Sequence, residues 1–237
     1  DSAEAWDSAV AGNGGVVVIE GEAGIGKSRI LHEVRRRTRH QRAKLLLFQC
    51  TPGGLRSALH PLLQNVRGDL AGNEGQLSAA AVAEVFRDHD VRDPEIIDIF
   101  SFLLGAAGAD PMLKEIDAEA MLAKANWAVR HSLEALCASG PIVLVVEDIH
   151  WIDLTSRQLL AELAQSARHF RALVIATTRP ESGSWLAVSN PKHISLKPLN
   201  REQTRLAIAA MWPQDKPSTS PELIDVVERV TGGVPLF

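Results

Sequence analysis

The sequence predicts an α/β fold in which a parallel sheet is covered by helices on both faces. Apolar, β-branched runs alternate with stretches of helical periodicity along most of the 237 residues, which is the pattern of parallel strands joined by helices. Hydrophobic residues make up 46% of the chain, enough to bury a large core as one domain or as a domain with an appendage. A glycine-rich loop also links the first strand directly to a helix.

The first two expected strands flank that loop and its helix. A short amphipathic helix containing Trp6 ends at the stretch AGNGG, and the β-branched run 16–20 then predicts a buried strand. The loop GEAGIGKS follows, and helical periodicity resumes over 27–39. A second apolar run, LLLF at 45–48, predicts the next strand.

A helical insertion is expected at about 51–140, between the second and third strands. Apolar segments with helical spacing occur there, and turn residues such as Pro94 and Gly105 separate them. The segments are SALHPLLQNV, LSAAAVAEVF, PEIIDIFSFLL and a long stretch from about 116 to 138.

The remaining strands follow the insertion. Apolar runs predict strands at 142–148 and 172–178, with a helix between them at about 154–167. HISL at 193–196 predicts a short fifth strand.

The end of the chain is expected to form a separate helical unit. Asn200 has the chemistry of a helix N-cap, helical spacing follows it, and a second helix near PELIDVVERV ends at a Gly-Gly pair. We therefore expect a core at 1–199 and the truncated start of a helical subdomain at 200–237.

The loop GEAGIGKS meets the phosphate-binding pattern G-x-x-x-x-G-K-[ST]. Its glycines let successive backbone N–H groups turn toward a phosphate, and the N-terminus of the next helix adds positive potential. We expect Lys27 to reach the β- and γ-phosphates of a nucleotide and Ser28 to ligate Mg²⁺. The residues expected to bind the nucleotide here are Gly21, Gly24, Ile25, Gly26, Lys27, Ser28 and Arg29.

Two adjacent carboxylates, Glu147 and Asp148, end the strand IVLVVED. They lie at the edge of the sheet where the glycine-rich loop also begins. Adjacent strand residues point in different directions, so one acid can serve the metal while the other faces an attacking water. The plainer alternative is a solvated acidic turn that caps the following helix.

The next strand, in ALVIATTRP, ends with Thr177, Thr178 and Arg179. Arginine offers planar, bidentate donors, so Arg179 together with the threonine hydroxyls is suited to contact a γ-phosphate. The alternative is an exposed loop arginine that precedes Pro180.

Composition gives no sign of a nucleic-acid or membrane partner. The net charge is −4, so the chain has no general attraction to phosphate backbones or acidic membranes. The basic run 35–42 falls at the C-terminal end of a helix, and we expect its cations to meet water. His150 is expected to pack and make one hydrogen bond. The tryptophans expected to pack rather than stack on bases are Trp127, Trp185 and Trp212.

The cysteines and the chain ends favour a cytoplasmic fragment of a longer protein. Cys50 and Cys137 match no metal-ligand spacing and are expected to be reduced, apolar residues. No run approaches the roughly 18 apolar residues that span a bilayer, and the first residues lack a signal region. Because the chain begins at Asp1 and ends in VPLF, we expect further sequence on either side.

Taken together, GEAGIGKS, VLVVEDIHWID, VIATTRP and TGGVPLF resemble the STAND branch of the AAA-like P-loop ATPases. The pair His150–Trp151, followed by Asp153, is similar to an extension of the second motif in bacterial members. FQCTPGGLRSALHPLLQ is similar to a stretch found where such ATPases accompany class III adenylate cyclase domains. The resemblance implies a P-loop NTPase fold with a five-stranded parallel sheet in the order 5-1-4-3-2 and a helical lid. We therefore expect part of a bacterial cyclase-associated or transcription-regulator ATPase.

The resemblance also implies roles for individual residues. Glu147 takes the magnesium-side position, Asp148 the catalytic position and Arg179 the sensor position, while Pro235 packs on adenine from the lid. Glu147 stands where Asp is more usual, which adds one methylene on the metal side. A further segment that helps to hold adenine precedes the first helix in the family, so we expect base recognition within this chain to be incomplete.

The function implied is that of a slow ATPase that binds ATP or ADP with Mg²⁺ and acts as a nucleotide-dependent switch. Its implied partners are ATP, an output domain in the same polypeptide or in another protein, and further copies of the chain. Two alternatives stay open. One is a nucleotide-binding module without turnover, and the other is a small-molecule phosphotransferase, for which neither an arginine-rich lid nor an acceptor pocket is identified.

Overall fold

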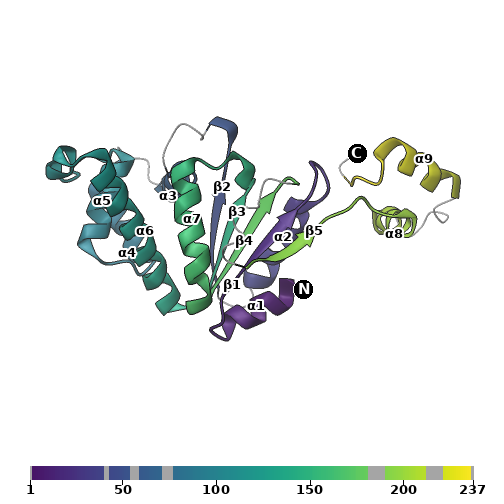
Figure 1. Ribbon diagram of the computed structural model, residues 1–237, viewed down its shortest axis with the longest axis horizontal. Helices are drawn as coiled ribbons and strands as arrows, with labels where there is room; N and C mark the ends of the chain where they lie inside the picture. The colour runs from purple at the N-terminus through teal and green to yellow at the C-terminus, as the bar shows by residue number, and fades with distance from the viewer. Residues whose placement is uncertain are drawn as a thin grey trace.

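The computed structural model describes residues 2–39, 43–53, 59–70, 77–180, 190–211 and 221–235. Within these ranges, one sheet of five parallel strands runs in the order β2-β3-β4-β1-β5 (Figure 1). The strands are β1 (Gly15–Glu20), β2 (Lys44–Gln49), β3 (Ile142–Glu147), β4 (Ala172–Thr178) and β5 (Lys192–Ser195). Read from the other edge, this is the expected order 5-1-4-3-2, so the predicted fold class is confirmed.

Helices cover both faces of the sheet, as the apolar character of the strands requires. The helices of this layer are α1 (Ser2–Val10), α2 (Lys27–Arg39) and α7 (Leu154–Ser166). On one face, Val145 belongs to a buried cluster with Trp6 of α1 and Leu31 of α2. On the other face, Val146 belongs to a cluster with Leu160 of α7. The two clusters alternate along β3 because successive strand residues point to opposite faces.

The register of the strands determines which strand ends meet. β4 pairs with β1 on one side, with Glu20 opposite Thr178, and with β3 on the other, with Val146 opposite Ala176. The C-terminal ends of β1, β4 and β3 are therefore consecutive along one edge of the sheet. This edge carries the three predicted phosphate, sensor and carboxylate motifs.

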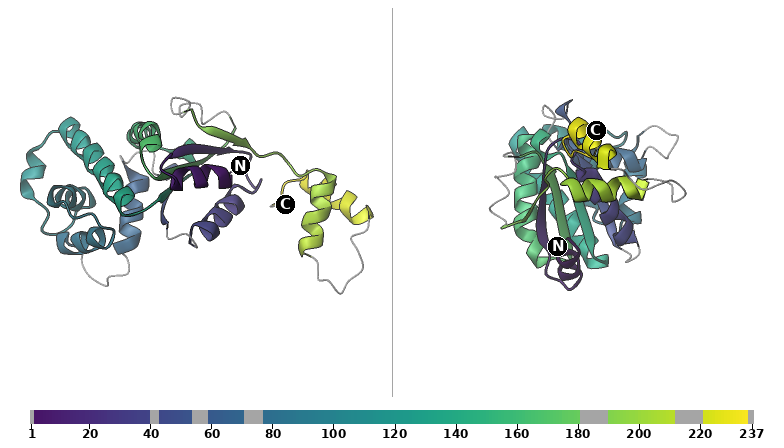
Figure 2. Two further views of the ribbon diagram at one scale, coloured as in Figure 1. Left: turned by 90° about the horizontal axis from the view of Figure 1, so that it is seen from below. Right: turned by 90° about the vertical axis from the view of Figure 1, so that its right-hand side faces the viewer.

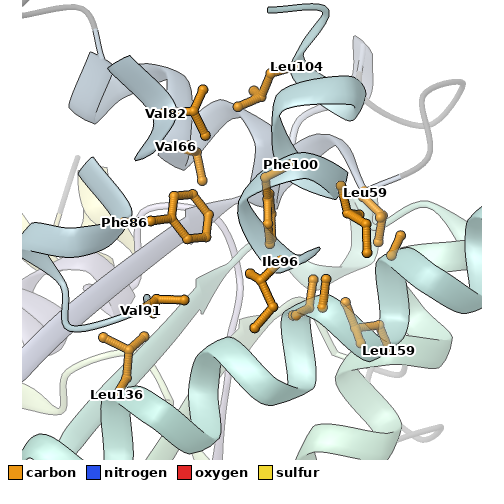
Figure 3. Packing of buried hydrophobic residues seen from close by; sticks show 14 of the residues in the cluster. Leu59, Val66, Val82, Phe86, Val91, Ile96, Phe100, Leu104, Leu136 and Leu159 are labelled. Atoms are coloured by element: carbon orange, nitrogen blue, oxygen red, sulfur yellow. The ribbon is translucent and has the colours of Figure 1, made fainter. Parts of the chain in front are cut away.

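The helices between β2 and β3 pack around a core that also includes Ile142 of β3 and Ala172 of β4. They are α3 (His60–Leu70), α4 (Ala79–Asp88), α5 (Pro94–Leu104) and α6 (Ala118–Ser139). The Phe86 and Phe100 rings lie 4.7 Å apart in this core, and Leu159 of α7 belongs to the same cluster (Figure 3). The first two residues of the expected helix SALHPLLQNV, 57–58, lie outside the described residues.

Two further helices, α8 (Arg201–Met211) and α9 (Pro221–Thr231), follow β5. They stand apart from the sheet and are joined to it by the segment after β5 (Figures 1 and 2). Asn200 is the expected N-cap: its Oδ1 accepts a hydrogen bond from Gln203 N at 2.9 Å, and Gln203 Oε1 accepts one from Asn200 N at 3.0 Å. Arg201 pairs with Asp225 and Glu228, which ties α8 to α9.

The expectations for the two cysteines and for Trp127 are also met. Cys50 and Cys137 are free and buried. Trp127 packs against the core of the inserted helices, whereas Trp185 and Trp212 lie outside the described residues. Among the helices that the structure describes, none combines the length and apolar character needed to cross a bilayer.

Candidate nucleotide site

The glycine-rich loop leaves β1 and leads directly into α2. Gly24 and Gly26 have φ values of +78° and +107°, a region that side chains other than glycine rarely adopt. At Gly21, a Cβ atom would lie 2.7 Å from Ile25 Cγ2. Glycine is therefore required here for backbone conformation and for close packing, as the predicted phosphate loop demands.

Lys27 folds back over this loop. Its Nζ donates hydrogen bonds to the carbonyl oxygens of Gly21 at 2.6 Å and Glu22 at 2.8 Å. Burial lowers the pKa of Lys27, and the negative charge of Asp148 opposes that effect. The ammonium group is thus held at the loop, in the electrostatic reach of the β3 carboxylate.

Asp148 lies directly beyond the end of β3 in a left-handed conformation, with φ +56° and ψ +47°. Aspartate tolerates this conformation better than most residues. Its backbone N–H donates to Thr177 Oγ1 at 3.0 Å, so a side chain of β4 helps to fix the turn that follows β3.

Glu147, the neighbouring acid, has a different environment. Its Oε1 lies 3.6 Å from Arg35 Nη2 of α2, and the two side chains are 17% and 34% exposed. Burial raises the pKa of Glu147, while the charge of Arg35 lowers it. The expectation that the basic run meets only water is therefore wrong for Arg35, because α2 packs over the face of the sheet to which Glu147 points. It is also wrong for Arg36 and Arg37, which pair with Glu33 on their own helix.

The end of β4 lies between the other two motifs. Thr178 is fully buried, and its carbonyl accepts a hydrogen bond from Gly21 N at 3.2 Å. Arg179 is exposed and influences the pKa of both Lys27 and His150 through its charge. The arginine is therefore electrostatically coupled to the loop.

A cleft of about 860 Å³ lies between the C-terminal edge of the sheet and helices α8 and α9, which together with the loop to Pro235 are called the lid below. Its volume is within the range of about 300–1,000 Å³ that is usual for small-molecule sites. The predicted site residues that line it are Gly24, Gly26, Lys27, Ser28, Arg29, Asp148, Arg179 and Pro235. The predicted residues that are not among its lining are Gly21, Ile25, Glu147 and Thr178.

Residues 3–175 match the AAA ATPase domain family. The chain belongs to this family. The protein R02095 of Rhizobium meliloti, described as uncharacterised, is 51% identical to this AAA ATPase domain over 235 residues. That match covers 98% of this chain and 23% of R02095, so the domain spans less than a quarter of the relative's length.

A solved structure gives a consistent picture of the fold. The AAA ATPase domain is similar to a STAND protein with a tetratricopeptide repeat sensor, PH0952 from Pyrococcus horikoshii, with a TM-score of 0.53 and 16% identity. The match covers 99% of this chain and 28% of that chain. At this identity the likeness shows the fold alone. The family match confirms the expected resemblance to AAA-like ATPases, and the fold is similar to that of a STAND protein.

The lid side of the cleft was only partly expected. Pro235 follows a loop that is anchored on the segment before α8: Leu199 N donates to Gly233 O at 2.8 Å. Gly233 has a φ of +77°, and a Cβ atom there would lie 2.4 Å from Leu199 O. The Gly-Gly pair that predicted the end of α9 thus also seats the loop against the core-to-lid connection.

Several lining residues escaped prediction. On the lid side these are Leu199, in the segment before α8, and Thr204, Ala207, Ile208, Ala210, Val227, Thr231, Gly233 and Val234 of the lid. Helical spacing identified most of them as part of amphipathic helices, but spacing alone does not say what an apolar face covers. The only signal for their position was the Pro235 resemblance, which places the end of the lid near the base.

His150 also lines the cleft. Both ring nitrogens are buried without a hydrogen-bond partner in the described part of the chain, so the expected single hydrogen bond is wrong. Burial lowers the pKa of His150, and the charge of Asp148 opposes this shift. Its ring lies 5.2 Å from that of Trp151, which lines the same cleft.

Proposed function

We propose that this AAA ATPase domain binds ATP with Mg²⁺ in the cleft and hydrolyses it slowly. In this proposal, the nucleotide acts as a regulatory switch within a larger signalling protein of the cyclase-associated or transcription-regulator type. The observation that carries the proposal is the composition of one cleft: Lys27, Asp148 and Arg179, from the segments that follow three separate strands, line it together with residues of the lid.

The phosphate chain is expected on the glycine-rich loop. Backbone N–H groups at the start of α2 favour an anion there, and Ser28 and Arg29 line the cleft beside them. Lys27 already bonds to two loop carbonyls, and a phosphate offers its ammonium group a charged acceptor in their place. This exchange gives the loop a preference for polyphosphates over neutral ligands.

The available donors suit magnesium. Ser28 offers a hydroxyl, and Glu147 and Asp148 offer carboxylates, which are the hard oxygen ligands that Mg²⁺ favours. When bound, the metal would neutralise charge on the phosphates. The family resemblance assigns Glu147 to the metal side and Asp148 to the attacking water; Asp148 lines the cleft, whereas Glu147 is not among its lining residues and contacts Arg35.

Arg179 is assigned to the γ-phosphate. It lines the cleft opposite the lid, and a planar guanidinium suits the charge that develops on a transferred phosphoryl group. With Lys27 and Arg29 it supplies the positive charge of the core wall.

A regulatory role is favoured by the way the cleft is built. Its walls come from the core and from the lid, so nucleotide binding couples the positions of the two parts. The domain accounts for 23% of R02095, which leaves most of a longer chain for output domains. We propose that such a domain, a separate protein or a further copy of the chain receives the signal.

Steady-state phosphate release from ATP alone tests the proposal against its two rivals. A switch ATPase releases phosphate without an acceptor and loses this activity on Asp148→Asn. A phosphotransferase needs an acceptor, and a pure binding module releases none while still binding ATP. No binding of ATP by calorimetry would contradict all three.

A further inference from the structure

The lid wall of the cleft is apolar apart from two threonines. Its apolar members are Ala207, Ile208, Ala210, Val227, Val234 and Pro235, next to Leu199 of the segment before α8. The core wall carries the charged residues Lys27, Arg29, Asp148 and Arg179. The cleft therefore has a charged half suited to phosphates and an apolar half suited to the flat faces of a base.

The two threonines of the lid wall differ in how their hydroxyls are bonded. Thr231 Oγ1 donates to Val227 O at 2.8 Å and accepts from Gly233 N at 3.1 Å, so it is occupied by the lid itself. Thr204 is 4% exposed, and its Oγ1 has no hydrogen-bond partner among the residues that the structure describes.

Some helical hydroxyls in the chain bond to their own helix, whereas those of Ser101 in α5 and Ser156 in α7 are buried without a partner among the described residues. Thr38 Oγ1 donates to Arg35 O at 3.1 Å, and Ser132 Oγ donates to Ala128 O at 2.7 Å. Thr204 has the same opportunity, since it lies one turn after Asn200, but only its backbone N–H bonds to Asn200 O, at 2.8 Å. A buried hydroxyl without a partner destabilises the fold, and of Thr204, Ser101 and Ser156 only Thr204 lines the cleft, where a bound molecule can supply the missing partner.

We propose that the Thr204 hydroxyl forms a hydrogen bond with the polar edge of the purine base of a bound nucleotide. The proposal rests on the proposed function and adds a residue that reads the base from the lid. Because a hydroxyl both donates and accepts, it can pair with the amino group of adenine or the carbonyl group of guanine. Thr204 thus increases the affinity for purine nucleotides over pyrimidine nucleotides but does not discriminate between ADP and GDP.

The test compares Thr204→Val, which keeps the shape of the side chain and removes the hydroxyl, with the unmodified 237-residue protein. Calorimetric titrations use ADP, GDP, UDP and inorganic pyrophosphate, none of which is hydrolysed at the γ position. We expect the valine variant to bind ADP and GDP about 3- to 10-fold more weakly, with pyrophosphate affinity unchanged. UDP affinity should also stay unchanged, because a pyrimidine base is smaller than a purine and does not reach the Thr204 hydroxyl.

Two further variants separate a direct contact from a structural effect. Thr204→Ser keeps the hydroxyl and should retain ADP affinity to within about twofold. Thr38→Val removes a hydroxyl from α2 outside the cleft and should not change ADP affinity. Without nucleotide, Thr204→Val should melt at the same or a higher temperature than the parent, since it removes an unpaired buried hydroxyl.

The outcomes that would overturn the proposal are distinct. Unchanged ADP affinity in Thr204→Val would show that the hydroxyl does not contact the nucleotide. An equal loss of affinity for ADP and pyrophosphate would mean that the hydroxyl acts on the phosphates or on the position of the lid. A loss of UDP affinity equal to that of ADP would mean that the hydroxyl contacts the ribose. If the parent protein binds neither ADP nor pyrophosphate, the proposed function fails and this inference fails with it.

Discussion

Arg35 Nη2 lies 3.6 Å from Glu147 Oε1, across the interface between α2 and the end of β3. Both side chains are largely shielded from solvent, and Arg35 Nε is buried without a hydrogen-bond partner in the described chain. The carboxylate assigned to the metal side therefore already has a cationic neighbour. Arg35 and Mg²⁺ would compete for the same charge, which links the packing of α2 to metal binding.

Replacement of Arg35 by Gln should lower the free energy of unfolding by about 1 kcal/mol, because the pair is partly screened by solvent. Arg35→Lys should recover part of this loss. Urea denaturation of Arg35→Gln, Glu147→Gln and the double variant checks the prediction through their coupling energy. Strictly additive effects would mean that the two side chains do not interact in solution.

Substitutions of the two acids at the end of β3, Glu147 and Asp148, should have different effects on ATP turnover. We expect Asp148→Asn to keep Mg-ATP binding and to lower turnover at least about 100-fold, as for loss of a catalytic base. Glu147→Gln should instead raise the Mg²⁺ concentration needed for half-maximal turnover. Phosphate release measured over a magnesium series distinguishes them, and the opposite pattern would reverse the assignment.

The contact between Gly233 and Leu199 should be intolerant of any side chain. Gly233→Ala combines a positive φ with a Cβ atom 2.4 Å from Leu199 O, so the loop that carries Pro235 must move. Gly232→Ala is a matched control, because its φ is +57° but no atom lies within 4 Å of the added Cβ. We expect ADP affinity, measured by calorimetry, to fall more in Gly233→Ala than in Gly232→Ala. Equal affinities of the two variants would mean that this loop does not contribute to nucleotide binding.

The two thiols should be unreactive while the protein is folded. Burial raises the pKa of Cys50 to about 12 and that of Cys137 to about 11. A raised pKa in the folded state stabilises the fold below the unfolded value, about 8.5, and this contribution is lost as the pH rises from there through 11 and 12. Iodoacetamide at pH 8.5 should label the folded protein far more slowly than the urea-unfolded one. Comparable rates would mean that the thiols are accessible.

The local motifs could be predicted from sequence because they rest on short-range chemistry. A β-branched run, a glycine-rich loop and a helix define the phosphate loop within residues 16–39. The N-cap chemistry of Asn200 predicted the N-terminus of α8. Strand order followed from the family resemblance rather than from periodicity, which does not report which strands are neighbours.

What the sequence could not provide depends on packing between distant segments. The Arg35–Glu147 pair joins residues 112 positions apart (147 − 35), and Arg35 sits in a basic run whose members look alike. Arg36 and Arg37 bond to Glu33 on their own helix, as helical spacing allows. The unpaired groups of Thr204 and His150 were equally hidden, because hydrogen-bond satisfaction is a property of the folded surroundings.

The central claim is that the glycine-rich loop and the lid enclose a nucleoside triphosphate, with Lys27 as the loop's cation for the phosphates. Titration of a fluorescent ATP analogue with Mg²⁺ into the parent protein and into Lys27→Ala tests it most directly. We predict that the substitution weakens binding of the triphosphate analogue by about 10- to 100-fold, because a charge-assisted hydrogen bond is lost. Binding of the diphosphate analogue should weaken less. Equal affinity of the parent and variant for the triphosphate would remove Lys27 from the site and contradict the account.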